Sequence, residues 1–273
     1  MSDTSMSSST VPSGNMVKVT KEGGLAIFEL NDPPANTYSY DMMRALDAAI
    51  LDARMDDAVH VIVIRGAGDK FFCAGANIKM LASVTPQFKY YFCLHANETL
   101  GRLEQTPKLV IAALNGHTVG GGLEVAMAAD LRLARAGGGK IGLPEVNLGV
   151  LPGTGGTQRL VRMVGKSKAL ELMIHGDNFS FEEAHALGLV NQVLPAEGWW
   201  DAVLAYARRF VPPGKAAKAV GRIKRAAQSG SEMPFSEALA FERELQQQLF
   251  ESADAREGMA AHVEKRAPQF TGR

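Results

Sequence analysis

A run of three glycines followed by a glutamate is the stretch of this sequence best suited to chemistry. Gly120–Gly122 come after a strand-like apolar run at 109–114, and Glu124 begins the apolar, helix-like segment that follows. Consecutive glycines mark places where the backbone approaches another group closely. The first amides of a helix have no partner within the helix and carry partial positive charge. The stretch therefore predicts a site that stabilises a developing oxyanion beside an acid–base group.

Residues 71–79 offer a second backbone stretch of this kind. The small side chains of Cys-Ala-Gly-Ala at 73–76 leave the amides uncovered, so the N–H of Ala76 is a candidate second oxyanion donor. Each stretch also has a purely structural interpretation. Residues 71–79 would then be a tight crossover packed against a sheet, and Glu124 a first-turn glutamate that interacts with the helix dipole.

A second carboxylate, Glu145, lies on a segment rich in glycine and proline. It follows Pro144 and stands between the apolar residues Leu143 and Val146. Partial desolvation at such a position raises the pKa of a carboxyl and suits it to proton transfer near neutral pH. The alternative is an ordinary exposed glutamate.

Several kinds of site are excluded by the sequence. The Gly153-x-Gly155 stretch has Gln158 where the dinucleotide fingerprint needs its third glycine, and no Gly-Lys-Ser/Thr of a P-loop follows. The six histidines are scattered without ligand spacing, so no metal is predicted. The Gly-x-Ser-x-Gly elbow of serine hydrolases is absent.

Composition and charge narrow the class of protein further. Lys+Arg and Asp+Glu both number 29, and this zero net charge predicts no nucleic-acid partner. No apolar run reaches the roughly 18 residues that span a membrane, so no membrane partner is predicted. The two cysteines, Cys73 and Cys93, form no disulfide framework and fit a reducing compartment, which predicts a cytoplasmic protein.

The elements that must position these groups alternate between strands and helices. We predict a disordered tail at 1–15, an α/β core with the site at 16–195, and a helical C-terminal region at 196–273. Successive core strands should pair largely in parallel through crossovers. Strands are expected at 17–20, 25–30, 59–64, 109–114, 131–136 and 189–194. Helices are expected at 40–55, 85–103, 199–210, 214–229, 234–250 and 253–266.

The three stretches, taken in this order, resemble the crotonase superfamily of enoyl-CoA hydratases and isomerases. The motifs that carry the resemblance are Cys-Ala-Gly-Ala-Asn-Ile-Lys at 73–79, Asn-Gly-His-Thr-Val-Gly-Gly-Gly-Leu-Glu at 115–124, and Pro-Glu-Val-Asn-Leu-Gly at 144–149. The resemblance implies an α/β fold that is a spiral of ββα units. It also implies a helical C-terminal region that builds a homotrimer, or a homohexamer that is a dimer of trimers.

The resemblance further implies the substrate and the roles of single residues. The substrate is an acyl-CoA thioester, and no separate cofactor is expected, since coenzyme A is part of the substrate. The amides of Ala76 and Gly121 hold the thioester oxygen, Glu124 acts mainly on water, and Glu145 acts mainly on the α-proton. The residues expected to bind substrate or CoA are Ala74, Ala76, Asn77, Ile78, Lys79, Gly121 and Lys265.

Two positions depart from the family pattern. Asn77 stands where an aspartate is common, and residues 32–36 replace a segment that often carries a basic residue. These departures leave the contacts to the CoA phosphates open.

The presence of both glutamates favours hydration of a 2-trans-enoyl-CoA. The alternatives are an enoyl-CoA isomerase, which can run on one carboxylate, and a dehydratase of a branched 3-hydroxyacyl-CoA. A non-catalytic protein that binds CoA or RNA is an alternative of another class.

Overall fold

The computed structural model describes residues 16–273, and the tail predicted at 1–15 lies outside the described residues. The strands of the described chain are β1 (Val17–Glu22), β2 (Leu25–Leu30), β3 (Val61–Gly66), β4 (Phe71–Cys73), β5 (Leu109–Leu114), β6 (His117–Val119), β7 (Leu131–Arg135), β8 (Lys140–Gly142), β9 (Phe179–Ser180) and β10 (Gln192–Leu194). The helices are α1 (Tyr40–Met55), α2 (Ile78–Ser83), α3 (Pro86–Gln105), α4 (Gly121–Met127), α5 (Gly156–Val164), α6 (Lys166–His175), α7 (Phe181–Ala186), α8 (Trp199–Arg208), α9 (Ala217–Gly230), α10 (Phe235–Phe250) and α11 (Ala253–Glu264), with a 3₁₀ turn, η1, at Glu145–Leu148.

The strands form two sheets. The larger has the order β1-β2-β3-β5-β7-β10, and the smaller has the order β4-β6-β8-β9. Within the larger sheet β1 and β2 form an antiparallel hairpin, and the other neighbours pair in parallel. The predicted parallel crossovers are therefore confirmed. Parallel strands of this kind are covered on both faces, which explains why β5 is buried along its whole length.

Each face of the larger sheet carries its own apolar core. Because side chains alternate along a strand, Ile62 and Ile64 of β3 join the larger core, which includes α1 and α4. Val61 and Val63 point to the other face and join a smaller core with α8. The helix α1 begins after Ser39, whose side chain accepts a hydrogen bond from the Met42 N–H.

The smaller sheet was not predicted. Residues 71–79 were expected to be a loop but contain β4 and the start of α2. The strand that directly precedes α4 is β6 rather than β5, and β8 was missed as well. These strands have three residues each, too few for the alternation of apolar and polar residues that reveals a strand. The strand expected at 189–194 is shorter than predicted, because only its last three residues pair with a neighbouring strand.

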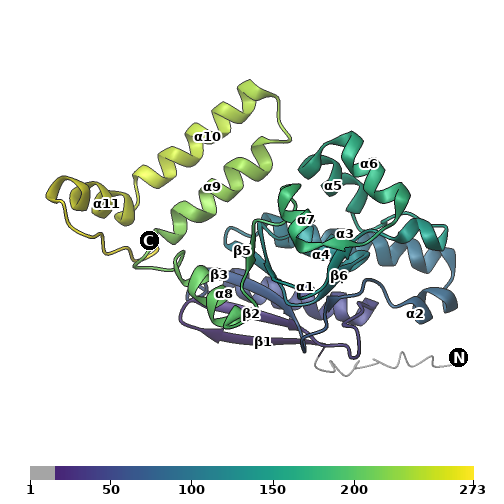
Figure 1. Cartoon of the computed structure of the whole chain (residues 1–273). Helices are drawn as coiled ribbons and strands as arrows, with labels where there is room; N and C mark the ends of the chain where they lie inside the picture. The colour runs from purple at the N-terminus through teal and green to yellow at the C-terminus, as the bar shows by residue number, and fades with distance from the viewer. Residues whose placement is uncertain (1–15) are drawn as a thin grey trace, which may run out of the picture.

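The regular elements described after β10 are the helices α8 to α11, and no strand follows β10 among the described residues. The helix α8 packs on the larger sheet, whereas α9 and α10 form a hairpin that projects from the sheets and α11 lies beyond it (Figure 1). We call these three helices, α9 to α11, the arm. Lys224 of α9 anchors this arm through a buried ion pair with Asp130, in which the Lys224 Nζ lies 2.9 Å from the Asp130 Oδ2. The helix α2 lies at the opposite end of the molecule from α11 (Figure 1).

Candidate active site

The glycine turn forms the N-terminus of α4, directly after β6. Gly120 precedes the helix with a φ of 57°, a conformation that favours glycine. Gly121 is the first helical residue, so its N–H has no partner within the helix. A Cβ on Gly122 would overlap the carbonyl oxygen of Cys73. Glycine is required here because the start of α4 lies directly against β4.

A second free amide, that of Ala76, is held next to this turn. The N–H of Tyr38 donates to the Gly75 oxygen at 2.9 Å, and the N–H of Asn77 donates to the Tyr38 oxygen at 3.0 Å. In this parallel bridge the N–H of Ala76 points away from Tyr38, because the residues on either side of it make the bonds. A Cβ on Gly75 would lie 3.0 Å from the Gly121 nitrogen, so the two stretches touch.

Glu124, in the first turn of α4, is 2% exposed. Its Oε1 accepts hydrogen bonds from the backbone N–H groups of Thr154 and Gly156, both at 2.7 Å. Burial raises the pKa of the Glu124 carboxyl, and the two amides oppose this rise. The carboxyl is thus held in a fixed position by the backbone of the 152–156 loop.

Glu145 is the first residue of η1, and its carboxyl faces the glycine turn. A Cβ on Gly120 would lie 3.1 Å from the Glu145 Oε1. The Oε2 atom is buried and has no hydrogen-bond partner among the described residues. Burial raises the pKa of the Glu145 carboxyl to about 7, and the charge of Glu124 adds to the rise. The pKa is raised in the direction predicted, although of the two apolar neighbours in the sequence Leu143 is buried and Val146 is 43% exposed.

The other predicted site residues are spread more widely. The Ala74 N–H donates to the Ala35 oxygen at 3.0 Å, and the Asn77 side chain caps α2 by accepting from the Met80 N–H at 3.0 Å. Ile78 and Lys79 are exposed on α2.

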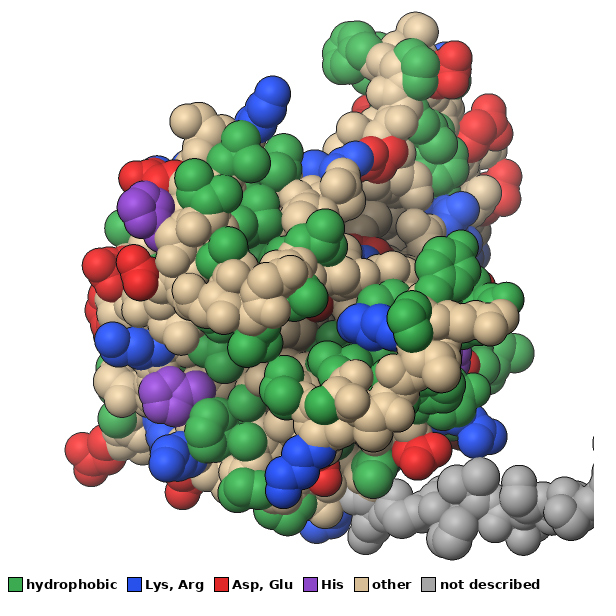
Figure 2. All heavy atoms as spheres, turned by 90° about the vertical axis from the view of Figure 1, so that its right-hand side faces the viewer, with side chains coloured by type: hydrophobic (Ala, Val, Ile, Leu, Met, Phe, Trp, Pro, Cys, Tyr) green, Lys and Arg blue, Asp and Glu red, His purple; other side chains and the backbone are tan. Residues whose placement is uncertain are grey.

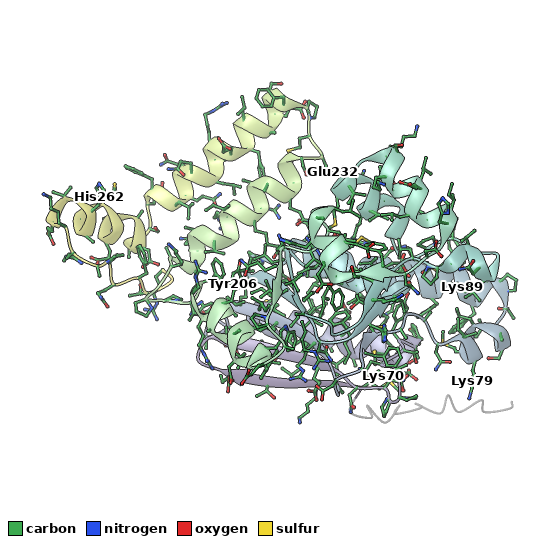
Figure 3. The ribbon with its side chains drawn as sticks, viewed as in Figure 1. Lys70, Lys79, Lys89, Tyr206, Glu232 and His262 are labelled. Carbon is green, nitrogen blue, oxygen red and sulfur yellow. The ribbon has the colours of Figure 1, made fainter. Side chains whose placement is uncertain are left out.

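Lys265 lies far from the remaining predicted residues within one chain. It follows directly after α11, and Figure 3 shows the nearby His262 at the opposite end of the molecule from Lys79. The structure therefore does not bring Lys265 to the site of its own chain.

Comparison with known proteins identifies the family. The family model described as enoyl-CoA hydratase/isomerase matches residues 20–273. The chain belongs to this family. A short-chain-enoyl-CoA hydratase of Clostridium acetobutylicum is 37% identical over 253 residues, which cover 92% of this chain and 96% of the relative.

Solved structures agree with this assignment. The crystal structure of an enoyl-CoA hydratase from Geobacillus kaustophilus has a TM-score of 0.92 at 46% identity and covers 94% of this chain and 97% of its own. An enoyl-CoA hydratase from Bacillus anthracis has a TM-score of 0.89 at 31% identity and covers 94% and 100%. The crotonase-like α/β fold predicted from the resemblance is therefore confirmed.

The sequence analysis did not predict three residues that position Glu124 in this family member. They are Thr154 and Gly156, whose amides hold Glu124, and Tyr38, whose hydroxyl lies 2.9 Å from the Thr154 Oγ1. The glycines around Thr154 were a usable signal, because a glycine-rich loop presents amides to any anion. They were tested only against phosphate-binding loops. Tyr38 had no comparable signal.

The end of the molecule near α2 carries many exposed apolar side chains. Figure 2 shows hydrophobic side chains gathered around a hollow on this side of the enoyl-CoA hydratase/isomerase fold. The exposed apolar residues of α2, α3 and the loop after Glu145 include Ile78, Tyr90, Tyr91, Leu94, Leu148, Val150 and Leu151.

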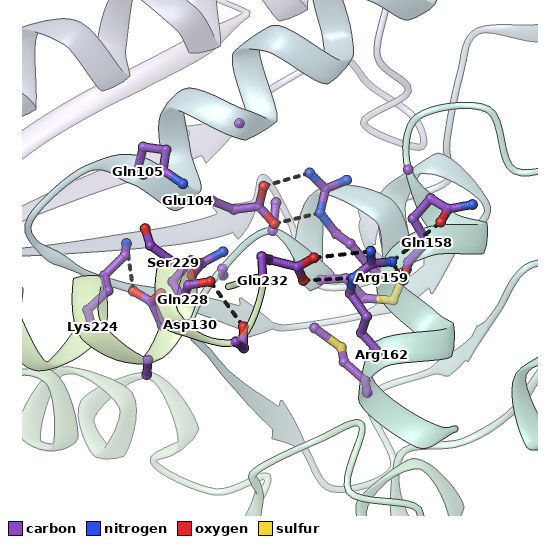
Figure 4. A pocket seen from close by; sticks show the side chains of 18 of the residues that line it. Glu104, Gln105, Asp130, Gln158, Arg159, Arg162, Lys224, Gln228, Ser229 and Glu232 are labelled. Carbon is purple, nitrogen blue, oxygen red and sulfur yellow. Dashed lines mark hydrogen bonds and ion pairs between the residues drawn. The ribbon is translucent and has the colours of Figure 1, made fainter. Parts of the chain in front are cut away.

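A separate cavity of about 1370 Å³ lies between the arm and the core, bordered by α3, α5 and α9. Its charged groups are already paired: Arg159 with Glu104 at 2.7 Å, and Arg162 with Glu232 at 2.8 Å (Figure 4). Neither Glu145 nor the two free amides line it. We place the candidate site at Glu124 and Glu145 rather than in this cavity, because the acid–base groups and the free amides lie there.

Two searches of residues 16–273 gave negative results. No group of three or more His, Cys, Asp and Glu side chains in this range could hold a metal ion. No helix in this range is long and apolar enough to cross a membrane.

Proposed function

We propose that this chain is an enoyl-CoA hydratase, which adds water reversibly and with syn geometry across the double bond of a 2-trans-enoyl-CoA. The observation that carries the proposal is the buried carboxyl of Glu124 and the half-buried Glu145, which has one buried oxygen, beside two free backbone amides. The relative from Clostridium acetobutylicum is described as a short-chain-enoyl-CoA hydratase, and one from Syntrophomonas wolfei as a crotonyl-CoA hydratase.

In the proposed reaction the N–H groups of Ala76 and Gly121 donate to the thioester oxygen. As water attacks the β-carbon, the electrons of the double bond move towards the carbonyl, and this oxygen takes negative charge. Fixed amide donors stabilise the charge where it develops, without the reorganisation that water would need. Small residues at 73–76 and 120–122 are what leave these donors uncovered.

The two glutamates divide the proton transfers. Glu124, held as a base by two amides, takes a proton from the attacking water, and the new C–O bond forms at the β-carbon. Glu145, whose pKa of about 7 keeps it partly protonated near neutral pH, gives its proton to the α-carbon. Dehydration runs through the same steps in reverse. The reaction needs no separate cofactor, because coenzyme A enters as part of the substrate.

The test is the addition of water to crotonyl-CoA. The reaction is monitored through the loss of the absorbance of the conjugated thioester. We expect turnover by the wild type and a loss of about a hundredfold or more in Glu145→Gln, with CoA-thioester binding retained. Rapid conversion of a 3-enoyl-CoA to a 2-enoyl-CoA without detectable hydration would show an isomerase instead. Binding of the thioester with neither reaction would show a non-catalytic protein.

We further propose that the chain assembles into a homotrimer or a pair of trimers. The support is the arm, whose large apolar side chains stand in solvent in the single chain: Phe235 and Val263 are each 80% exposed, and Phe250 is 60% exposed. Burial of such side chains against a second copy would be favourable. Light scattering measures the mass directly, and a monomer at working concentration would refute the proposal.

A further inference from the structure

One buried tyrosine, Tyr38, contacts both amide stretches of the proposed site and the loop that holds Glu124. Its backbone holds the chain on both sides of Ala76. Its ring covers the start of α4, since a Cβ on Gly121 would overlap the Tyr38 hydroxyl. The same hydroxyl lies 2.9 Å from the Thr154 Oγ1. The two amide donors and the loop that carries Thr154 are thus fixed relative to one side chain.

Thr154 continues this contact to Glu124. Its backbone N–H donates to the Glu124 Oε1 at 2.7 Å, and this bond lowers the pKa of Glu124 against the larger effect of burial. Tyr38, Thr154 and Glu124 are each at most 3% exposed. In so dry a place a hydrogen bond is stronger than in water, and no solvent is at hand to replace it.

The direction of the hydrogen bonds follows from the charges. Burial raises the pKa of Tyr38 well above its usual value, and the nearby Glu124 carboxylate raises it further. The phenol therefore stays protonated and can donate. The oxygen of the Thr154 hydroxyl has lone pairs with which it can accept this bond.

We propose that Tyr38 is a positioning residue whose hydroxyl donates to the Thr154 hydroxyl, so that Thr154 is held where its backbone N–H supports the carboxylate form of Glu124. The inference rests on the proposed hydratase function, in which Glu124 is the base for water. The Tyr38 hydroxyl does not itself touch the reacting atoms in this scheme. Its loss should therefore change kcat and the pH dependence, and leave KM nearly unchanged.

The test compares Tyr38→Phe, Thr154→Val and Thr154→Ser in hydration of crotonyl-CoA. We expect kcat to fall about three- to tenfold in Tyr38→Phe and in Thr154→Val. The acid limb of the pH profile should move to higher pH, because a less supported carboxylate takes up a proton more readily. Thr154→Ser keeps the hydroxyl and should retain most activity. The double variant Tyr38→Phe/Thr154→Val should lose little more than either single variant, because both break the same chain of bonds.

The matched control is Tyr206→Phe. Tyr206 lies on α8, which packs on the other face of the larger sheet, so removal of its hydroxyl should leave kcat, KM and the pH profile unchanged (Figure 3). Thermal unfolding and CoA-thioester binding of each variant separate a loss of positioning from a loss of fold. If Tyr38→Phe does not fold, Thr154→Val decides by the same readouts.

Two results overturn the inference while the proposed function stands. One is an active wild type with kcat and pH profile unchanged in Tyr38→Phe. The other is a Tyr38→Phe loss confined to KM. A wild type that does not hydrate crotonyl-CoA instead refutes the function and the inference together, and this is seen before any variant is compared.

Discussion

The two glutamates of the site are held in opposite ways. Glu124 has one oxygen fixed by two backbone amides, which favour its charged form. Glu145 has a buried oxygen without a partner among the described residues, and the cost of burying its charge outweighs the opposing effects of its own backbone N–H and of Lys89. Two chemically identical groups thereby acquire different tasks, one as a base and the other as an acid.

The shared proton of this pair predicts the pH dependence. Hydration needs the proton on Glu145 and dehydration needs it on Glu124, so both directions need the pair with one proton. Because the pKa of Glu145 is about 7, the proton is lost as the pH rises through this value. We expect kcat/KM to fall above about pH 7 with the same alkaline limb in both directions. Profiles measured with crotonyl-CoA and 3-hydroxybutyryl-CoA check this, and limbs that differ between directions would contradict it.

Part of the site could be read from neighbouring residues in the sequence. The raised pKa of Glu145 was predicted from the apolar residues beside it, of which only Leu143 is buried, and the free amide of Gly121 was predicted from its place at a helix start. The contact between Tyr38 and Thr154 could not be read, because it joins residues 116 positions apart. Only the packing of the 152–156 loop against α4 brings them together.

At the scale of elements, the long helices were predictable and the short strands were not. The six apolar residues whose helical spacing predicts the helix at 40–55 are all buried in α1: Met42, Met43, Leu46, Ala49, Ile50 and Ala53. Thr85 and Pro86 likewise mark the true start of α3. The three-residue strands β4, β6 and β8 have no such periodicity. Pairing with neighbours distant in the sequence is what makes them strands.

The close contact between α4 and β4 predicts a strong effect of Gly122→Ala. The added Cβ would overlap the Cys73 carbonyl oxygen, a backbone atom that no rotamer change can move. We expect a loss of about 1–3 kcal/mol in the free energy of unfolding, and a lower kcat because the Gly121 amide shifts with the helix. Urea denaturation and crotonyl-CoA hydration measure the two effects.

Gly101→Ala is the matched control for this prediction. Gly101 lies within α3, and a Cβ there would meet no atom within 4 Å. Alanine favours a helix interior over glycine, so this variant should be as stable as the wild type or more stable by up to about 1 kcal/mol. Equal behaviour of the two variants would show that α4 is not held as tightly as the structure indicates.

At the scale of the whole molecule, the stability of the fold depends on the buried ion pair that joins the arm to the core. Lys224 enters the core from α9, where its Nζ donates to the Lys108 oxygen at 3.0 Å and pairs with Asp130. Burial lowers the pKa of Lys224 and raises that of Asp130, while each charge stabilises the other. Removal of one partner would leave a buried charge alone, which costs more than the pair itself contributes.

We therefore expect Lys224→Ala to lower the free energy of unfolding by about 3 kcal/mol. Urea denaturation at one fixed protein concentration measures the loss. Replacement of both partners, Lys224→Met with Asp130→Asn, which keeps an acceptor for the Val110 N–H, should recover most of it. The exposed pair provides the comparison: Arg162→Ala breaks the contact with Glu232 and should cost less than about 1 kcal/mol. A loss in Lys224→Ala no larger than that in Arg162→Ala would contradict the anchoring role.

Much of the site is built from main-chain groups, which a substitution of the side chain does not remove. The donors of Ala76, Gly121, Thr154 and Gly156 are main-chain amides, and every residue except proline has an N–H, although a side chain at Gly121 or Gly156 would displace it. Glu124 and Glu145 are side chains and are open to replacement one at a time. After gene duplication, a descendant of this chain would retain the means to hold a thioester while its acid–base chemistry changed, and new reactions of the same substrates would lie a few mutations away.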